Sequence, residues 1–318
     1  MGPPIDGEGC SNEDEETTMT TAPRRPPFLR RAWIFVPGMD LDTQRAAITG
    51  GADVVVADLE EFTAPADRPE ARLRIAALMA QCRAHRVVGA VRVNRLEADG
   101  RDDLAGVMPG RPELVFLPHV ETAVQIEALC AELTTLEAAH GIADGGTEIV
   151  PTIESATGLL GLGPILRASP RIKACLLAAE DFADSLGAER GPDAIELLHA
   201  RGRFLLECVA AGCAAVDCPC TFRAADAFEQ DLALAKRLGF KAKCVVFPEH
   251  VAPLNRAFTP SAEAVTAAEE LCAAWERQRR APPADIGRWI DSPHVNNARR
   301  LIARHKAFTG YAGVARAD

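Results

Sequence analysis

The sequence predicts an α/β fold, a (β/α)₈ barrel of TIM-barrel type followed by a C-terminal helical extension. Eight short apolar runs recur along the chain, and stretches rich in Ala, Leu and Glu that are long enough for a helix separate most of them. The alternative is an open, doubly wound sheet, which carries a glycine-rich phosphate turn after its first strand. Here the first run ends in Phe35-Val36-Pro37-Gly38 without a GxGxxG pattern, so the barrel is favoured.

The eight expected strands are continuous apolar or β-branched runs rather than alternating ones. This pattern is typical of parallel strands that are covered on both faces. The runs lie at 32–37, 53–59, 87–93, 114–120, 148–153, 174–179, 214–217 and 242–247.

Helical stretches fill most of the connections between these strands. The clearest are 67–84, 122–140, 156–168, 193–211 and 223–238. Eight strands alternating with helices over about 220 residues indicate one barrel rather than two domains. Two more helices, near 260–280 and 292–306, exceed what a barrel needs. We therefore expect a barrel over 28–258 and a helical extension over 259–318 that contacts a neighbouring subunit.

The first 27 residues differ in composition from the rest. Acidic Glu13–Glu16, a Thr-rich patch and several prolines offer little apolar surface to bury. Such a segment cannot offset its ordering entropy, so we expect residues 1–27 to form a disordered tail.

Composition excludes several classes of function. The chain has 318 residues and a formal net charge of −10, which is against nucleic-acid binding because that needs a basic face. No apolar run approaches the roughly 20 residues that span a bilayer. The N-terminus lacks a secretory pattern. The ten cysteines form no zinc pattern, and several lie in apolar runs. Reduced thiols in the cytoplasm are the simplest interpretation.

Polar residues follow the expected strands, where barrel enzymes place their active groups. Each carboxylate alone has an equally simple role as a helix cap. Together they crowd one mouth, and like charges that close repel unless a cation relieves them. A hard divalent cation held by two carboxylates and water fits best, with Mg²⁺ as the default. The strand-end residues are Asp58, Glu60, Glu61, Arg92, Asn94, His119, Glu121, Glu154, Glu180, Asp181 and Asp217.

An ordered series of motifs over about residues 30–310 resembles the citrate lyase beta subunit group. This group includes malyl-CoA, methylmalyl-CoA and citramalyl-CoA lyases, within the HpcH/HpaI aldolase–citrate lyase superfamily. The matching segments are Phe35-Val36-Pro37-Gly38, Gly51-Ala52-Asp53, Asp58-Leu59-Glu60, Val91-Arg92-Val93-Asn94, Leu117-Pro118, Ile153-Glu154, Glu180-Asp181, Asn255 and Phe258-Thr259-Pro260-Ser261.

The resemblance implies roles for individual residues. Glu154 and Asp181 match the two carboxylates that hold Mg²⁺, with Mn²⁺ as an alternative. Arg92 matches an arginine that contacts the substrate's carboxylate or carbonyl oxygens, where its planar fork suits a bidentate clamp. Glu60 lies in the matching acidic motif and is expected to contact the metal-binding residues rather than the metal itself.

The segment Trp289-Ile290-Asp291-Ser292-Pro293 resembles one whose aspartate reaches the active site of an adjacent subunit in relatives. Asp291 is therefore the candidate acid/base, contributed in trans, although it also suits the N-cap of the last helix. A shared site implies a homo-oligomer, a trimer or a dimer of trimers. For the coenzyme A part of the substrate, Arg31, Arg68 and Lys243 are candidate phosphate contacts, equally explicable as solvated surface charges.

Three positions depart from the pattern of the resembled group. Glu61 stands where an aspartate is usual, His119 where a lysine is common, and Phe247 where a histidine is frequent. A histidine exchanges a fixed charge for a titratable group. A lone histidine at a strand end is more often a hydrogen-bonded structural group than a base.

The resemblance implies a Mg²⁺-dependent carbon–carbon lyase that cleaves or forms a 3-hydroxyacyl-CoA thioester such as malyl-, citramalyl- or citryl-CoA. The products are an acyl-CoA and an oxo acid, and the intermediate is an enolate. Two alternatives stay open. One is a metal-dependent aldolase of a free 4-hydroxy-2-oxo acid, and the other is a subunit that depends on an acyl carrier partner.

Overall fold

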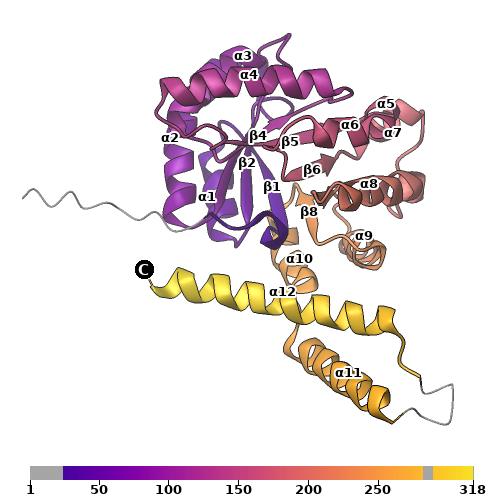
Figure 1. Ribbon diagram of the computed structural model, residues 1–318. Helices are drawn as coiled ribbons and strands as arrows, with labels where there is room; N and C mark the ends of the chain where they lie inside the picture. Colours follow the sequence, from indigo (N-terminus) through magenta and orange to yellow (C-terminus); the bar gives the residue numbers. More distant parts are fainter. Residues whose placement is uncertain (1–23, 282–288, 318) are drawn as a thin grey trace, which may run out of the picture.

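A closed barrel of eight parallel strands forms the body of the protein (Figure 1). The computed structural model describes residues 24–281 and 289–317. Each strand pairs with the next along the chain, and the last pairs with the first. The predicted (β/α)₈ fold is confirmed. The strands are β1 (Ala32–Pro37), β2 (Val54–Asp58), β3 (Val88–Arg92), β4 (Leu114–Leu117), β5 (Glu148–Ile153), β6 (Ala174–Leu177), β7 (Ala214–Asp217) and β8 (Ala242–Val245).

Helices surround the barrel and continue beyond it. Those that follow the strands are α1 (Leu41–Thr49), α2 (Arg68–Ala84), α3 (Gly100–Val107), α4 (Ala123–Ala139), α5 (Ala156–Leu160), α6 (Leu162–Arg167), α7 (Glu180–Leu186), α8 (Leu198–Ala210), α9 (Ala225–Leu238) and α10 (Val251–Phe258). The extension consists of α11 (Ala262–Arg280) and α12 (Ser292–Ala317).

The helix expected over 156–168 is two short helices that meet at Gly161. The Gly161 amide donates to the carbonyls of Thr157 and Leu159, which ends α5, and α6 begins with the next residue. A side chain at this position would approach the carbonyl oxygen of Glu121 to 2.9 Å. Glycine therefore permits the close approach that breaks the helix.

Aromatic and branched side chains fill the barrel interior. The ring of Phe116 meets Trp33 and Phe35 edge to face, at centroid distances of 5.8 and 5.3 Å. Such T-shaped pairs are the favoured geometry for aromatic rings. A second, larger apolar layer lies between the strands and the surrounding helices. Packing on both faces explains why the strands are continuous apolar runs.

Ion pairs close the barrel at the end where the strands begin. Arg30 is fully buried, and its guanidinium donates two hydrogen bonds of 2.6 and 2.9 Å to Glu148 at the start of β5. Arg24 also pairs with Glu148, at 3.1 Å, and Arg25 pairs with Asp53 at 2.7 Å.

The disordered tail expected over residues 1–27 falls mostly outside the described residues. Its last four residues, 24–27, contact the barrel through the Arg24 and Arg25 ion pairs. Residues 24–27, which were expected to belong to the tail, therefore pack on the barrel.

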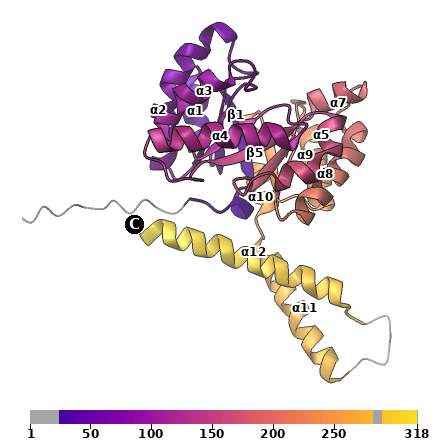
Figure 2. The ribbon, with the colours of Figure 1, turned by 45° about the horizontal axis from the view of Figure 1, so that its top comes forward.

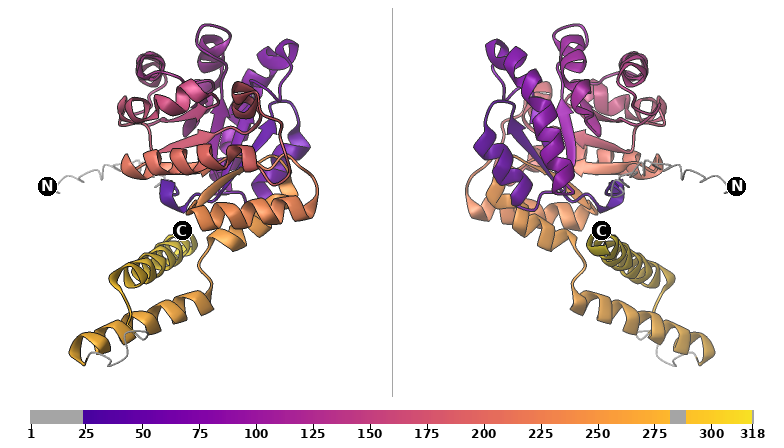
Figure 3. Two further views of the ribbon diagram at one scale, coloured as in Figure 1. Left: turned by 90° about the vertical axis from the view of Figure 1, so that its right-hand side faces the viewer. Right: turned by 90° about the vertical axis from the view of Figure 1, so that its left-hand side faces the viewer.

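The extension lies beside the base of the barrel, away from the carboxyl ends of the strands. Figures 2 and 3 show α11 and α12 standing off from the barrel and packing on each other. Arg304 of α12 donates to the carbonyls of Phe28 and Lys241, which precede β1 and β8. None of the described helices is both long enough and apolar enough to cross a membrane.

Candidate active site

A buried arginine and two acidic residues form the floor of the site, at the carboxyl ends of β2 and β3. Arg92 donates from Nε and Nη2 to the two oxygens of Asp58, at 2.8 and 2.5 Å. Its Nη1 lies 3.0 Å from Glu60. Burial alone would lower the pKa of Arg92, but the neighbouring Asp58 and Glu60 charges outweigh burial and raise it. The guanidinium is thus held in a fixed plane by two carboxylates.

His119, in the turn after β4, lies between two carboxylates. Its Nε2 is 3.2 Å from Oε1 of Glu60, and its Nδ1 is 2.7 Å from Oε2 of Glu154. The contacts with Glu154 and Glu60 raise the pKa of His119 to about 10, so the ring is an imidazolium at neutral pH. Its backbone is left-handed, with φ of 52°. Strained backbone of this kind concentrates at functional sites.

Glu60 is the shared partner of Arg92 and His119. Burial favours its neutral form, but the hydrogen bond with His119 and the charge of Arg92 outweigh burial and lower its pKa. Glu60 is therefore ionised, as expected for a residue that supports the site rather than one that donates protons.

Glu154, directly after β5, is the least satisfied carboxylate of the site. Only 3% of the residue is exposed, and within the described part of the chain neither of its oxygens has an aligned hydrogen-bond donor. Burial raises its pKa, and the His119 contact offsets this only in part. A buried carboxylate of this kind is stabilised by a cation.

Asp181, at the start of α7, lines the same cavity as Glu154. The cavity has a volume of about 360 Å³ and is also lined by Arg95, His119, Gln125 and Ser155. We call it the polar lobe of the mouth.

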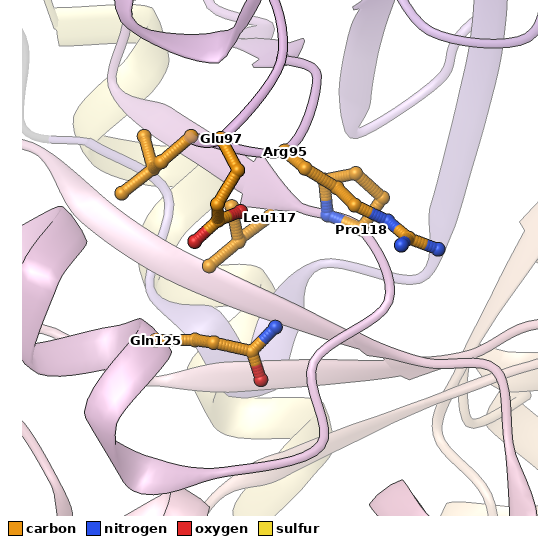
Figure 4. Close-up of a pocket in the computed structure, with 6 residues that line it drawn as sticks. Arg95, Glu97, Leu117, Pro118 and Gln125 are labelled. Carbon is orange, nitrogen blue, oxygen red and sulfur yellow. The ribbon is translucent and has the colours of Figure 1, made fainter.

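Asp181 also lines a second cavity of about 230 Å³, lined by Arg92, Phe35, Leu176, Pro219 and Val246 among others. We call it the apolar lobe. Asp181 therefore stands where the two lobes meet, and Glu154 and Arg92 face one lobe each. A third hollow of about 10 Å³ adjoins the polar lobe, with which it shares the lining residues Arg95 and Gln125 (Figure 4).

The donors at this site fit a hard cation such as Mg²⁺ better than zinc. Glu154 keeps one oxygen, Oε1, without a partner among the described residues, and Asp181 adds a half-buried carboxylate in the same cavity. The described residues contain no group of three or more His, Cys, Asp or Glu side chains placed to hold a metal. Two carboxylates completed by water and substrate oxygens are the usual environment of Mg²⁺.

The three candidate phosphate contacts lie in different places. Arg68 is at the mouth, where it pairs with Asp99 at 2.8 Å and donates to the carbonyl of Glu60 at 3.0 Å. Arg31 precedes β1 at the opposite end of the barrel and pairs with Asp53 at 2.8 Å. The structure thus corrects the expectation for Arg31, because the mouth lies at the carboxyl end of that strand.

The expectation for Lys243 is also corrected. Its ammonium is fully buried and lies 2.8 Å from Asp217 and 2.6 Å from Asp231. Arg201 completes the cluster, with hydrogen bonds of 2.6 Å to Asp217 and 2.7 Å to Asp231. Asp217 is therefore part of a buried ion-pair network between strands and helices and is not a group of the mouth. Neither Lys243 nor Asp217 is available to a ligand.

Asp291 is the residue before α12, and it is largely exposed. It accepts a hydrogen bond from the His294 amide at 3.3 Å, and this bond, with the His294 side chain, lowers its pKa. Because α12 runs along the base of the barrel (Figure 1), Asp291 does not lie at the mouth of its own subunit.

Besides His119, the two other positions that depart from the resembled group also lie at or near the mouth. Glu61 lines the apolar lobe beside Phe62. Phe247, just after β8, packs under the guanidinium of Arg223 at 4.2 Å and against the His250 ring. The residue is therefore engaged in an aromatic cluster.

The family follows from comparison with known proteins. Residues 31–248 match the family described as HpcH/HpaI aldolase/citrate lyase. The chain belongs to this family. It is 31% identical over 284 residues to the citrate lyase subunit beta of Haemophilus influenzae, a match that covers 88% of this chain and 98% of the relative. It is 30% identical to the L-malyl-CoA/beta-methylmalyl-CoA lyase of Rhodobacter capsulatus, over 89% and 96% of the two chains.

A solved structure supports the fold of this family member. The protein CitE from Mycobacterium tuberculosis, in complex with magnesium, acetoacetate and coenzyme A, is 24% identical and superposes with a TM-score of 0.66. The match covers 86% of this chain and 97% of CitE. At this level of identity the likeness establishes the barrel fold.

Proposed function

We propose that this family member is a Mg²⁺-dependent carbon–carbon lyase that cleaves, or in reverse forms, a 3-hydroxyacyl-CoA thioester. The observation that carries the proposal is Glu154, a buried carboxylate whose described polar contact is the ion pair with His119, in one cavity with Asp181. The named relatives are lyases of citrate and of malyl-CoA thioesters, which have the matching chemistry.

Glu154 and Asp181 would hold the cation, Mg²⁺ or in its place Mn²⁺. The cation supplies Lewis acidity that lowers the pKa of the substrate hydroxyl and fixes the scissile bond. Glu60 would not bind the cation itself but would orient the groups around it. It accepts a hydrogen bond from His119 and forms an ion pair with Arg92.

Arg92 would stabilise the negative charge that develops on the oxygen of the substrate. Asp58 holds its guanidinium through two hydrogen bonds, so the group is already oriented before substrate binds. A preorganised donor of this kind stabilises a transition state without reorganisation at the moment of reaction.

Asp291 would act as the acid/base of a neighbouring subunit. Its place at the base of its own barrel, on an extension that stands off from the barrel, supports a role in trans (Figure 3). The proposed assembly is a homo-oligomer, a trimer or a dimer of trimers, in which extensions reach adjacent mouths. Arg68 is the candidate that remains for coenzyme A, since it lies beside Glu60 at the rim.

A cytoplasmic location fits the cysteines. Nine cysteines within the described residues are free thiols, and six of these lie buried in apolar layers of the barrel. Free thiols persist where glutathione keeps the compartment reducing.

The test is release of a 2-oxo acid from a panel of malyl-, methylmalyl-, citramalyl- and citryl-CoA, with and without Mg²⁺. We expect release that needs the metal and falls by at least about 100-fold in Asp181→Asn and Glu154→Gln. Mn²⁺ binding followed by electron paramagnetic resonance should weaken in the same variants. The matched control is Glu127→Gln, an exposed carboxylate on α4.

A different outcome of this assay would support one of the two alternative functions. If no thioester released an oxo acid while Mn²⁺ still bound, the site would belong to a free 4-hydroxy-2-oxo acid aldolase or to a carrier-dependent subunit. Adding free 4-hydroxy-2-oxo acids, or an acyl carrier protein, to the same assay separates these two.

A further inference from the structure

We infer that Arg95 binds a second carboxylate on the oxo-acid half of the substrate, so that the site selects thioesters that release a 2-oxodicarboxylate. This inference rests on the proposed lyase function and specifies its substrate class.

Arg95 is the first residue beyond Arg92-Val93-Asn94, in the turn that follows β3. Figure 4 shows its side chain extended past Pro118, whereas the carboxylate of Glu97 lies on the other side of the hollow. Among the described residues, no carboxylate lies within ion-pair distance of Arg95 and none hydrogen-bonds to its guanidinium. Arg95 is exposed at the mouth, whereas Arg68 and Arg92 are mostly buried and are each held by a carboxylate partner.

Arg95 lines the polar lobe together with both proposed metal ligands, Glu154 and Asp181. His119 lines the same cavity. The guanidinium therefore lies beside the reacting centre and not on a remote surface.

The other charges of the polar lobe already have roles. Glu154 and Asp181 would hold the metal, and His119 contacts Glu60 and Glu154. Glu121 accepts a hydrogen bond of 2.6 Å from the Ser155 hydroxyl.

Asp184 is exposed and completes the acidic groups of this lobe. Of the two basic side chains among the lining residues of the polar lobe, Arg95 is the one that has its full hydrogen-bonding capacity free for a ligand.

The reaction sets which part of the substrate meets each lobe. A base removes the proton from the 3-hydroxyl, the carbon–carbon bond breaks, and its electron pair becomes the thioester enolate. The alcohol carbon becomes the carbonyl of a 2-oxo acid, and an acid then protonates the enolate carbon.

The apolar lobe, with Phe35, Leu176, Pro219 and Val246, suits the acyl-thioester half. The oxo-acid half, whose first carboxylate would meet the cation held by Glu154 and Asp181, would then extend into the polar lobe. A second carboxylate on that half would meet Arg95, whose planar fork binds carboxylates with two parallel hydrogen bonds.

Free oxo acids provide the test, because they carry no phosphate and therefore report no contact with coenzyme A. The probes are two matched pairs, 2-oxoglutarate with 2-oxopentanoate and oxaloacetate with 2-oxobutanoate, titrated calorimetrically with Mg²⁺ present. A charged hydrogen-bond pair at a partly open site predicts that wild type binds each dicarboxylate about tenfold more tightly than its monocarboxylate match.

Arg95→Gln should reduce this preference to about twofold or less while leaving monocarboxylate affinity unchanged, because only one ion pair is lost. Arg95→Lys should retain part of the preference, since a lysine keeps the charge and loses the fork. The matched control is Arg45→Gln on α1, an arginine whose side chain is 69% exposed and which lines neither lobe of the mouth.

Equal affinity for the members of each pair in wild type, or a preference that survives in Arg95→Gln, would overturn the inference. A wild type that binds none of the four acids with Mg²⁺ would contradict the proposed function itself. The two failures are distinguishable, because only the second abolishes monocarboxylate binding.

Discussion

His119 explains how Glu60 and Glu154 stay close together before any cation binds. Its ring contacts both carboxylates, and these contacts raise its pKa to about 10. The imidazolium therefore balances negative charge in the mouth at neutral pH. The left-handed backbone at His119 directs the ring to this place, and histidine is one of the non-glycine residues that adopt this conformation more readily than most.

The buried ion pairs of Lys243 predict an effect on stability rather than on substrate binding. Lys243→Ala leaves Asp217 and Asp231 buried with Arg201 as their only strong partner, so we expect a loss of about 3 kcal/mol in the free energy of unfolding. Urea unfolding at pH 7 measures this. The exposed Lys236→Ala on α9 is the control, and it should change stability by less than about 0.5 kcal/mol.

The KM for the thioester distinguishes a structural role of Lys243 from the role of a phosphate contact that the sequence suggested. The folded Lys243→Ala enzyme should keep its KM for the thioester. An unchanged stability together with a raised KM would return Lys243 to the role of a phosphate contact.

The sequence was informative about which residues follow the strands but not about their contacts. Glu154, Asp181 and Arg92 could be named because parallel strands end at one face of the barrel. The contacts of His119 with Glu60 and Glu154 join turns that are 59 and 35 residues apart along the chain, so no local pattern reveals them. Lys243 was misplaced because its neighbours Ala242 and Cys244 face the barrel interior, which turns Lys243 outward.

Among the elements, strands were predicted more reliably than helices. A strand buried on both faces leaves a continuous apolar run, which stands out in any sequence. The short helices α1, α3, α7 and α10 were not singled out, because they have only seven to nine residues. Short helices are formed by tertiary packing more than by their own propensity.

The prediction of an active site shared between subunits concerns Asp291, the residue before helix α12. Asp291→Ala and Asp181→Ala subunits should each lose activity by about 100-fold or more, because each lacks one part of every site. Subunits of the two variants that are unfolded and refolded together should regain activity, since some mouths then combine an intact Asp181 with an intact Asp291. Steady-state cleavage of the best thioester measures this.

Each variant refolded alone is the control for that experiment. Mixed oligomers that form, as judged by a tag on one variant, and yet stay inactive would contradict the contribution of Asp291 in trans.

In the whole molecule, the two ends of the barrel have separate tasks. The mouth keeps a carboxylate unsatisfied, whereas the base satisfies its charges through Arg30, Glu148, Arg24 and Glu113. This division is common in barrels of this type, in which one face serves catalysis and the other stability. The short apolar runs predicted the barrel, but the ion pairs of Arg24 and Arg30 at the base could not be predicted because they connect residues more than 80 positions apart.

The Arg30–Glu148 pair predicts the dependence of stability on pH. Burial favours neutral Glu148, but the hydrogen bonds and charges of Arg30 and Arg24 outweigh burial and lower its pKa below 4.5. A lowered pKa means that the stabilisation is complete above pH 4.5 and is lost as the pH falls through the folded-state value. Glu148→Gln should therefore cost about 3 kcal/mol at pH 7, because it leaves Arg30 buried without its charge partner.

The difference between wild type and Glu148→Gln should shrink as the pH falls below 4.5, which urea unfolding at several pH values would measure. Glu132→Gln on α4 removes an exposed ion pair with Arg101 and should change little. A difference that stayed constant down to pH 3 would show that the charge of Glu148 is not what stabilises the base.

The net charge of −10 has a consequence for how an anionic thioester would approach the mouth. The long-range field of the protein repels such a molecule, so the rate of encounter is not increased by electrostatic steering. Salt screens that repulsion within about 10 Å at 0.1 M ionic strength. Capture would then depend on a few cations at the rim, chiefly Arg68 and Arg95, which act only once the molecule has already come close. For this enzyme, moderate salt would assist the arrival of substrate rather than hinder it.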